Sequence, residues 1–132
     1  MTAGGGATGG VADGLEARAA ELRAEAVMTM TDLAGPTSAC SLARDGRSFP
    51  SYKLHEGRYA AASELVRALR RELAGEGRDA AALAVLADAR ARWADEVARR
   101  QDQGKDWLAY ATGGSDLVEQ LAEELAGADG GA

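Results

Sequence analysis

Apolar residues recur every three or four positions in the first third of the chain. From Asp13 or Leu15 to Leu33 they form one stripe, and most charged residues fall outside it. The stripe consists of Leu15, Ala19, Leu22, Ala26, Met30 and Leu33. This spacing predicts an amphipathic helix. Gly35 and Pro36 end it, because proline moves the preceding residue out of the helical region.

The same periodicity returns in the second half. A second helix is predicted from Glu56 or Arg58 to Ala74, before the glycines at 75 and 77. A third is predicted to begin with Asp79 as its cap and to end near Gln103, before Gly104. The inward positions are expected to be Tyr59, Ala62, Val66, Leu69 and Leu73 in the second helix, and Leu83, Leu86, Trp93 and Val97 in the third.

The last 27 residues are predicted to contain a short turn and then a helix. Asp106 is expected to cap the turn, which covers residues 107–110 and stops before Gly113 and Gly114. Ser115 or Asp116 is expected to cap the final helix. Its inward positions are Leu117, Val118, Leu121 and Leu125.

The stretch between the first two helices is irregular. Asp45–Gly46 suits a two-residue hairpin turn, since both central positions of that turn require positive φ. A short β-hairpin over residues 40–51 would place Leu42 opposite Phe49, and Pro50 would confine it to an edge. An ordered loop is the alternative, because isolated hairpins are marginally stable.

Together these patterns predict an all-α fold, a small Ala-rich bundle of four to five helices with this hairpin as an option. Residues 11–126 are expected to form one helical domain, and residues 1–10 and 127–132 are expected to be disordered tails. Ala accounts for 31 residues, whereas Leu, Val and Phe together account for 21 and Ile is absent. Such a core buries little apolar area. Self-association through the first helix would bury more, so we expect a homodimer, with a monomer as the alternative.

Composition excludes several classes of protein. No apolar run is long enough to span a membrane, and the first ten residues lack the pattern of a secretory signal. One Cys and one His make a structural metal site improbable, and no cofactor is expected. Arg outnumbers Lys by 13 to 2, which suggests a GC-rich, bacterial genome. We expect a cytoplasmic protein.

Charge is segregated along the chain. Residues 34–71 carry an excess of basic groups, whereas residues 106–132 carry only acidic ones. The arginines of the middle could converge on an anion beside the helix start at residues 56–58, since a helix N-terminus attracts anions. The candidate binding residues are Arg44, Arg47, Arg58, Arg67 and Arg71, with Trp107 as a partly exposed contact residue. Alternatively, these arginines form a solvated face that pairs with Glu64, Glu72 or the acidic C-terminal helix.

No catalytic constellation stands out. Cys40 and His55 are the only residues that could form a thiol–imidazole pair, but no local motif supports that use. Trp93 is expected to be a core residue. The leading interpretation is a small non-enzymatic protein that acts through protein–protein interaction, as a homodimer. The alternatives are a nucleic-acid-associated regulator that uses the Arg-rich face at residues 44–71, and an enzyme or binder for a small anionic ligand.

Overall fold

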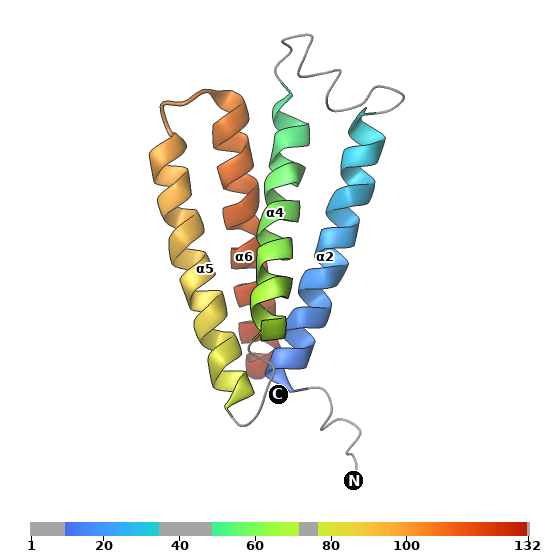
Figure 1. Cartoon of the computed structure of the whole chain (residues 1–132), viewed down its shortest axis with the longest axis vertical. Helices are drawn as coiled ribbons and strands as arrows, with labels where there is room; N and C mark the ends of the chain where they lie inside the picture. Colours follow the sequence, from blue (N-terminus) through green and yellow to red (C-terminus); the bar gives the residue numbers. More distant parts are fainter. Residues whose placement is uncertain (1–9, 35–48, 72–76, 132) are drawn as a thin grey trace.

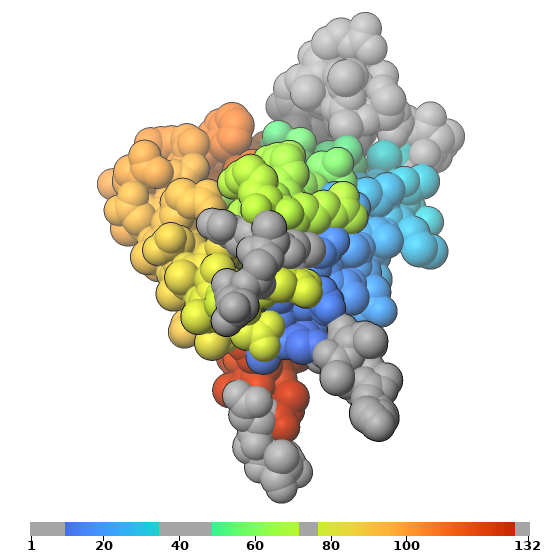
Figure 2. Space-filling model, turned by 60° about the horizontal axis from the view of Figure 1, so that its bottom comes forward, coloured from blue at the N-terminus to red at the C-terminus, as the bar shows by residue number. Residues whose placement is uncertain are grey.

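The computed structural model describes residues 10–34, 49–71 and 77–131. This part of the chain contains four helices, α2 (Val11–Ala34), α4 (Pro50–Arg71), α5 (Arg78–Arg100) and α6 (Lys105–Gly131), which run alternately in opposite directions (Figure 1). The α4–α6 and α2–α4 interfaces are the most extensive. Figure 2 shows α5, α4 and α2 side by side on one face of the bundle, with α4 in the middle. The all-α prediction is confirmed.

α4 begins earlier than the sequence pattern predicted. Its first residue is Pro50, a position where proline is favoured because the first helical N–H needs no partner within the helix. Pro50 and Ser51 are therefore helical, so their predicted place in a β-strand is wrong. The rest of the predicted hairpin, residues 40–48, lies outside the described residues. Gly57 lies inside α4, so no helix begins at residues 56–58.

α6 is a single helix that runs through Gly113 and Gly114, where the sequence predicted a break. Both glycines are buried against neighbouring helices. A Cβ on Gly113 would lie 2.7 Å from the carbonyl carbon of Leu54 in α4, so only glycine permits this approach. The described residues therefore form four helices and not five. α6 also continues past Ala126, the expected end of the helical domain, to Gly131.

Two acidic residues that were expected to cap their own helices cap neighbouring ones. The Asp79 carboxylate, in the first turn of α5, accepts a hydrogen bond from the backbone N–H of Ala12 in α2 (3.0 Å). Asp106, in the first turn of α6, accepts one from the N–H of Phe49, directly before α4 (3.0 Å). α5 itself starts after Gly77, which has a left-handed backbone (φ 81°) and provides no side-chain cap.

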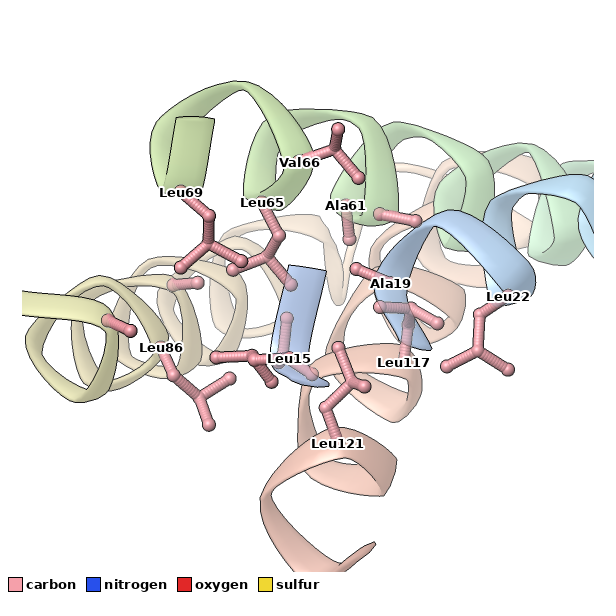
Figure 3. Close-up of a cluster of buried hydrophobic side chains, with 14 of the residues drawn as sticks. Leu15, Ala19, Leu22, Ala61, Leu65, Val66, Leu69, Leu86, Leu117 and Leu121 are labelled. Atoms are coloured by element: carbon pink, nitrogen blue, oxygen red, sulfur yellow. The ribbon is translucent and has the colours of Figure 1, made fainter. Parts of the chain in front are cut away.

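The core lies between all four helices, where leucines alternate with alanines (Figure 3). Leu22, Leu65, Leu69, Leu117 and Leu121 are almost fully inaccessible to solvent. Trp93 is also buried, as predicted. Alanines at helix contacts allow the helix axes to approach closely.

Three expected core residues are exposed instead. Leu83 is 47% exposed because it lies to one side of the buried face of α5. That face consists of Ala82, Leu86, Ala89 and Trp93. Tyr59 lies at the margin of the buried stripe of α4 and is 39% exposed. Leu33 is 37% exposed because no residue of α2 after Ala26 is buried. Leu73 lies outside the described residues.

Candidate functional site

α2 has apolar or small uncharged residues on two faces. The inner face packs into the core through Ala12, Leu15, Ala19, Leu22 and Ala26. A second row, which we call the outer stripe, consists of Ala17, Ala20, Ala24, Val27 and Thr31. Its members are separated alternately by three and four residues, the spacing of a helix–helix contact in coiled coils. Ala20 is half-buried and the other four are exposed.

The outer stripe is most apolar in the last third of α2. Val27 is 42% exposed, and Met28 beside it is 68% exposed. Toward Ala34, α2 diverges from α4 (Figure 1), and none of its residues beyond Ala26 is buried. Sequence reasoning missed Val27 and Met28 because it followed only the inner stripe. The alternation of three and four from Ala17 to Thr31 was the signal that could have identified Val27, and Met28 follows it directly.

Two charged residues of α2, Arg18 and Glu16, are engaged within the bundle beside the outer stripe. Arg18 donates through Nε (2.8 Å) and a terminal nitrogen (3.1 Å) to the two carboxylate oxygens of Glu124 in α6. Arg70 in α4 donates to Glu16 (2.8 Å). Hydrogen bonds from Arg18 and then Gln120 lower the pKa of Glu124. These pairs hold α2 on α4 and α6 and leave the outer stripe uncharged.

The predicted arginine cluster is not assembled in the described part of the chain. Arg44 and Arg47 lie outside the described residues. Arg58 is directed to α6, where it donates to the side-chain oxygen of Gln120 (2.7 Å). Arg67 and Arg71 are exposed on α4 and form no ion pair with residues that the structure describes. No helix N-terminus supports these residues, because α4 begins at Pro50.

The acidic residues of α6 form ion pairs with arginines of α2 and α5. The sequence had suggested arginines of residues 44–71 as their partners. Besides Arg18 of α2, Arg90 of α5 binds Glu119 through two hydrogen bonds of 2.9 Å. This interaction lowers the pKa of Glu119. Carboxylates of α6 therefore bind α2 and α5, while α4 contacts α6 through buried leucines and, at Gly57 and Gly113, through close backbone packing.

Trp107 lies in the first turn of α6 and is 45% exposed, in agreement with its predicted partial exposure. Its ring has two cationic neighbours, Lys53 at 5.2 Å and Arg100 at 4.9 Å from the centroid. Tyr110 meets it edge-on at 5.9 Å. Cation–π contacts of this kind fix the orientation of an exposed indole. Its use as a contact residue stays a prediction.

The structure describes only one member of the Cys40–His55 pair. Cys40 lies outside the described residues. His55 is half-buried in α4, and its pKa is lowered first by burial and then by the nearby charge of Arg58. A lowered pKa favours neutral imidazole at neutral pH.

The described part of the chain shows no sign of a metal centre or of a membrane-spanning helix. Among the described residues, no three His, Cys, Asp or Glu side chains are grouped so that they could hold a metal ion. None of the described helices is long and apolar enough to cross a membrane. Comparison with known proteins finds no matching family model, no similar curated protein and no similar solved structure.

Proposed function

We propose that this chain is a non-enzymatic cytoplasmic protein that acts through protein–protein contacts, as a homodimer joined by the outer stripe of α2. The observation that carries the proposal is the exposure of Val27, on the uncharged outer stripe, and of Met28 directly beside it. Large apolar side chains that lie together at a surface are typical of interaction sites.

A second copy is the occupant that fits this face best. A two-fold contact pairs the same patch from both copies, so an uncharged stripe meets an uncharged stripe and no charge is buried without a partner. The small residues Ala17, Ala20 and Ala24 allow two helix axes to approach closely. Val27 and Met28 then supply apolar area that the Ala-rich core of one copy lacks.

Size-exclusion chromatography with light scattering tests this proposal. We expect a dimer for the unchanged chain and a shift toward monomer for Val27→Glu and Met28→Glu. Leu83→Glu is the matched control, since Leu83 is an equally exposed apolar residue on α5. It should leave the mass unchanged. A monomer at about 100 μM, well above a micromolar dissociation constant, would overturn the homodimer.

Nucleic-acid binding is a second candidate, supported by the exposure of Arg67 and Arg71. With Arg44, Arg47 and Arg58 they would contact phosphates, and binding would weaken steeply with salt. A gel-shift assay at low salt tests this function. Arg67→Ala together with Arg71→Ala should abolish the shift, whereas Arg90→Ala should not, because Arg90 is occupied by Glu119.

A third candidate is an enzyme or binder for a small anionic ligand, with Cys40 or His55 as the reacting group. It rests on the residue types alone. Any activity found should be lost in Cys40→Ser or His55→Ala, and an activity intact in both variants would exclude these residues from it.

A further inference from the structure

A pocket of about 190 Å³ lies between α4, α5 and α6, away from the outer stripe of α2. Its lining residues are Glu64, Arg92, Trp93, Glu96, Arg99 and Tyr110. Ligand pockets for drug-sized molecules occupy about 300–1,000 Å³, so this one suits a smaller metabolite. Its mixture of aromatic and charged side chains is common in sites that orient a polar ligand.

Trp93, one of the lining residues, has a buried donor without a partner. The residue is only 5% exposed, and its indole N–H makes no hydrogen bond with any described residue. The six-membered ring packs against Gly114 of α6, with Cδ2 2.6 Å from where a Cβ on that glycine would lie. This contact fixes the position of the ring and provides no acceptor for its N–H. A buried donor without an acceptor is destabilising, and a ligand oxygen would relieve that cost.

The charges of the lining form two ion pairs. Arg92 bridges to Glu64 of α4 at 2.6 Å, and Arg99 binds Glu96 at 2.5 Å within α5. Both arginine side chains are more than half exposed, and exposed ion pairs of this kind contribute little to stability, so a ligand can replace one partner of a pair at small cost. A ligand with one charge would leave either a carboxylate or a guanidinium without a partner. A ligand with both charges would satisfy each half of an opened pair.

The Tyr110 hydroxyl lies near the carboxylates of the lining. Burial raises the pKa of this hydroxyl, and the charges of Glu64, Glu56 and Glu96 raise it further, against a smaller opposing effect of Lys53. The raised pKa keeps the hydroxyl neutral at neutral pH, so Tyr110 adds a hydrogen-bonding group to the pocket without adding a charge.

We propose that this pocket binds a small zwitterion, a free α-amino acid. The ligand carboxylate accepts hydrogen bonds from the Trp93 N–H and from Arg92, and its ammonium group lies beside Glu64, Glu96 and the Tyr110 hydroxyl. This site is independent of the homodimer contact, because none of its residues belongs to α2.

Nuclear magnetic resonance of the ¹⁵N-labelled full-length chain tests the proposal. The chain has two tryptophans, so its two indole N–H signals can be assigned with Trp107→Phe. Each of the common L-amino acids is added singly to about 10 mM, a concentration that detects a millimolar dissociation constant. We expect at least one to shift the Trp93 indole signal. Its N-acetyl amide, which lacks both charges, should leave that signal in place.

Two charge-matched variants make the test specific. Glu64→Gln removes a carboxylate of the pocket and should weaken binding at least about tenfold. Glu119→Gln removes the partner of Arg90, a comparable interhelical pair outside the pocket, and should leave binding unchanged. The proposal is overturned if no amino acid moves the Trp93 signal, if the N-acetyl amide binds equally well, or if both variants weaken binding alike.

Discussion

Gly57 of α4 lies against the backbone carbonyl of Tyr110 in α6, so closely that a Cβ on Gly57 would stand 2.8 Å from the carbonyl carbon. Gly113 of α6 stands in the reciprocal position against the Leu54 carbonyl group. The two helices therefore touch through their backbones at this level. Neither carbonyl can rotate away without breaking a helical hydrogen bond.

Gly57→Ala should separate α4 from α6 and destabilise the chain. We expect the free energy of unfolding to fall by at least about 2 kcal/mol, because backbone cannot yield as a flexible side chain can. Urea denaturation measures the change. Gly14→Ala in α2 is the matched control, since nothing lies within 4 Å of its Cβ position. It should raise stability by about 0.5–1 kcal/mol. Equal effects of the two substitutions would rule out the backbone contact.

Asp79→Ala should destabilise the chain through α2, although the substituted residue belongs to α5. It removes the acceptor of the Ala12 N–H, and loss of an N-terminal cap costs about 0.5–2 kcal/mol. Amide hydrogen exchange should therefore become faster in the first turn of α2. Asp88→Ala, an exposed change on the same helix, should have no such effect. Faster exchange confined to α5 would contradict the interhelical cap.

Leu86 and Leu83 should respond very differently to truncation. Leu86 is 4% exposed, so Leu86→Ala should cost about 2–5 kcal/mol by leaving a cavity. Leu83 is 47% exposed, and Leu83→Ala should change stability by no more than about 0.5 kcal/mol. Thermal or urea unfolding of both variants measures this contrast. A larger cost at Leu83 would mean that the sequence-based assignment of the inward face was correct.

His55 should make stability depend on pH below neutrality. Its pKa in the folded chain is lowered by burial and by Arg58, whereas an unfolded histidine titrates near 6.5. The unfolded chain therefore binds the proton first as pH falls, and stability decreases from about pH 6.5 toward the folded pKa. Glu119 and Glu124, whose pKa values are lowered, add their own loss at lower pH, from the ordinary pKa of a carboxyl group down toward their lowered values.

Urea unfolding at about pH 7.5 and about pH 5.5 separates these contributions. The unchanged chain should lose more stability than His55→Gln over this interval, because glutamine does not titrate. Parallel losses in the two proteins would show that His55 contributes nothing to the dependence.

Local sequence determined the helical character of the chain and most of its inward-facing residues. The repeat of Leu15, Ala19, Leu22 and Ala26 is sufficient to identify the buried face of α2, because helical periodicity alone brings these residues onto one side. Trp93 was identifiable as a core residue for a related reason: few large apolar groups are available to fill an Ala-rich interior.

Tertiary structure decided the features that depend on a neighbouring helix. Two consecutive glycines, such as Gly113 and Gly114, usually indicate the end of a helix, yet α6 continues through them. Backbone of α4 and the ring of Trp93 occupy the space that side chains at these positions would need. Asp79 and Asp106 were expected to cap their own helices, yet the Asp79 carboxylate accepts from an N–H of α2 and the Asp106 carboxylate accepts from the N–H of Phe49, directly before α4. A residue's local preference does not include the position of a donor far away in the sequence.

The two candidate sites also depend in part on sequence and in part on tertiary structure. The spacing of Ala17, Ala24 and Val27 can be seen in the sequence. Their exposure depends on the tertiary structure, because the other helices cover only the inner face of α2. The pocket at Trp93 combines residues from three helices, and no pattern along one of them specifies it. Periodicity determines which residues share a face, because it is a property of one helix. Packing decides which faces are covered, because that depends on how several helices meet.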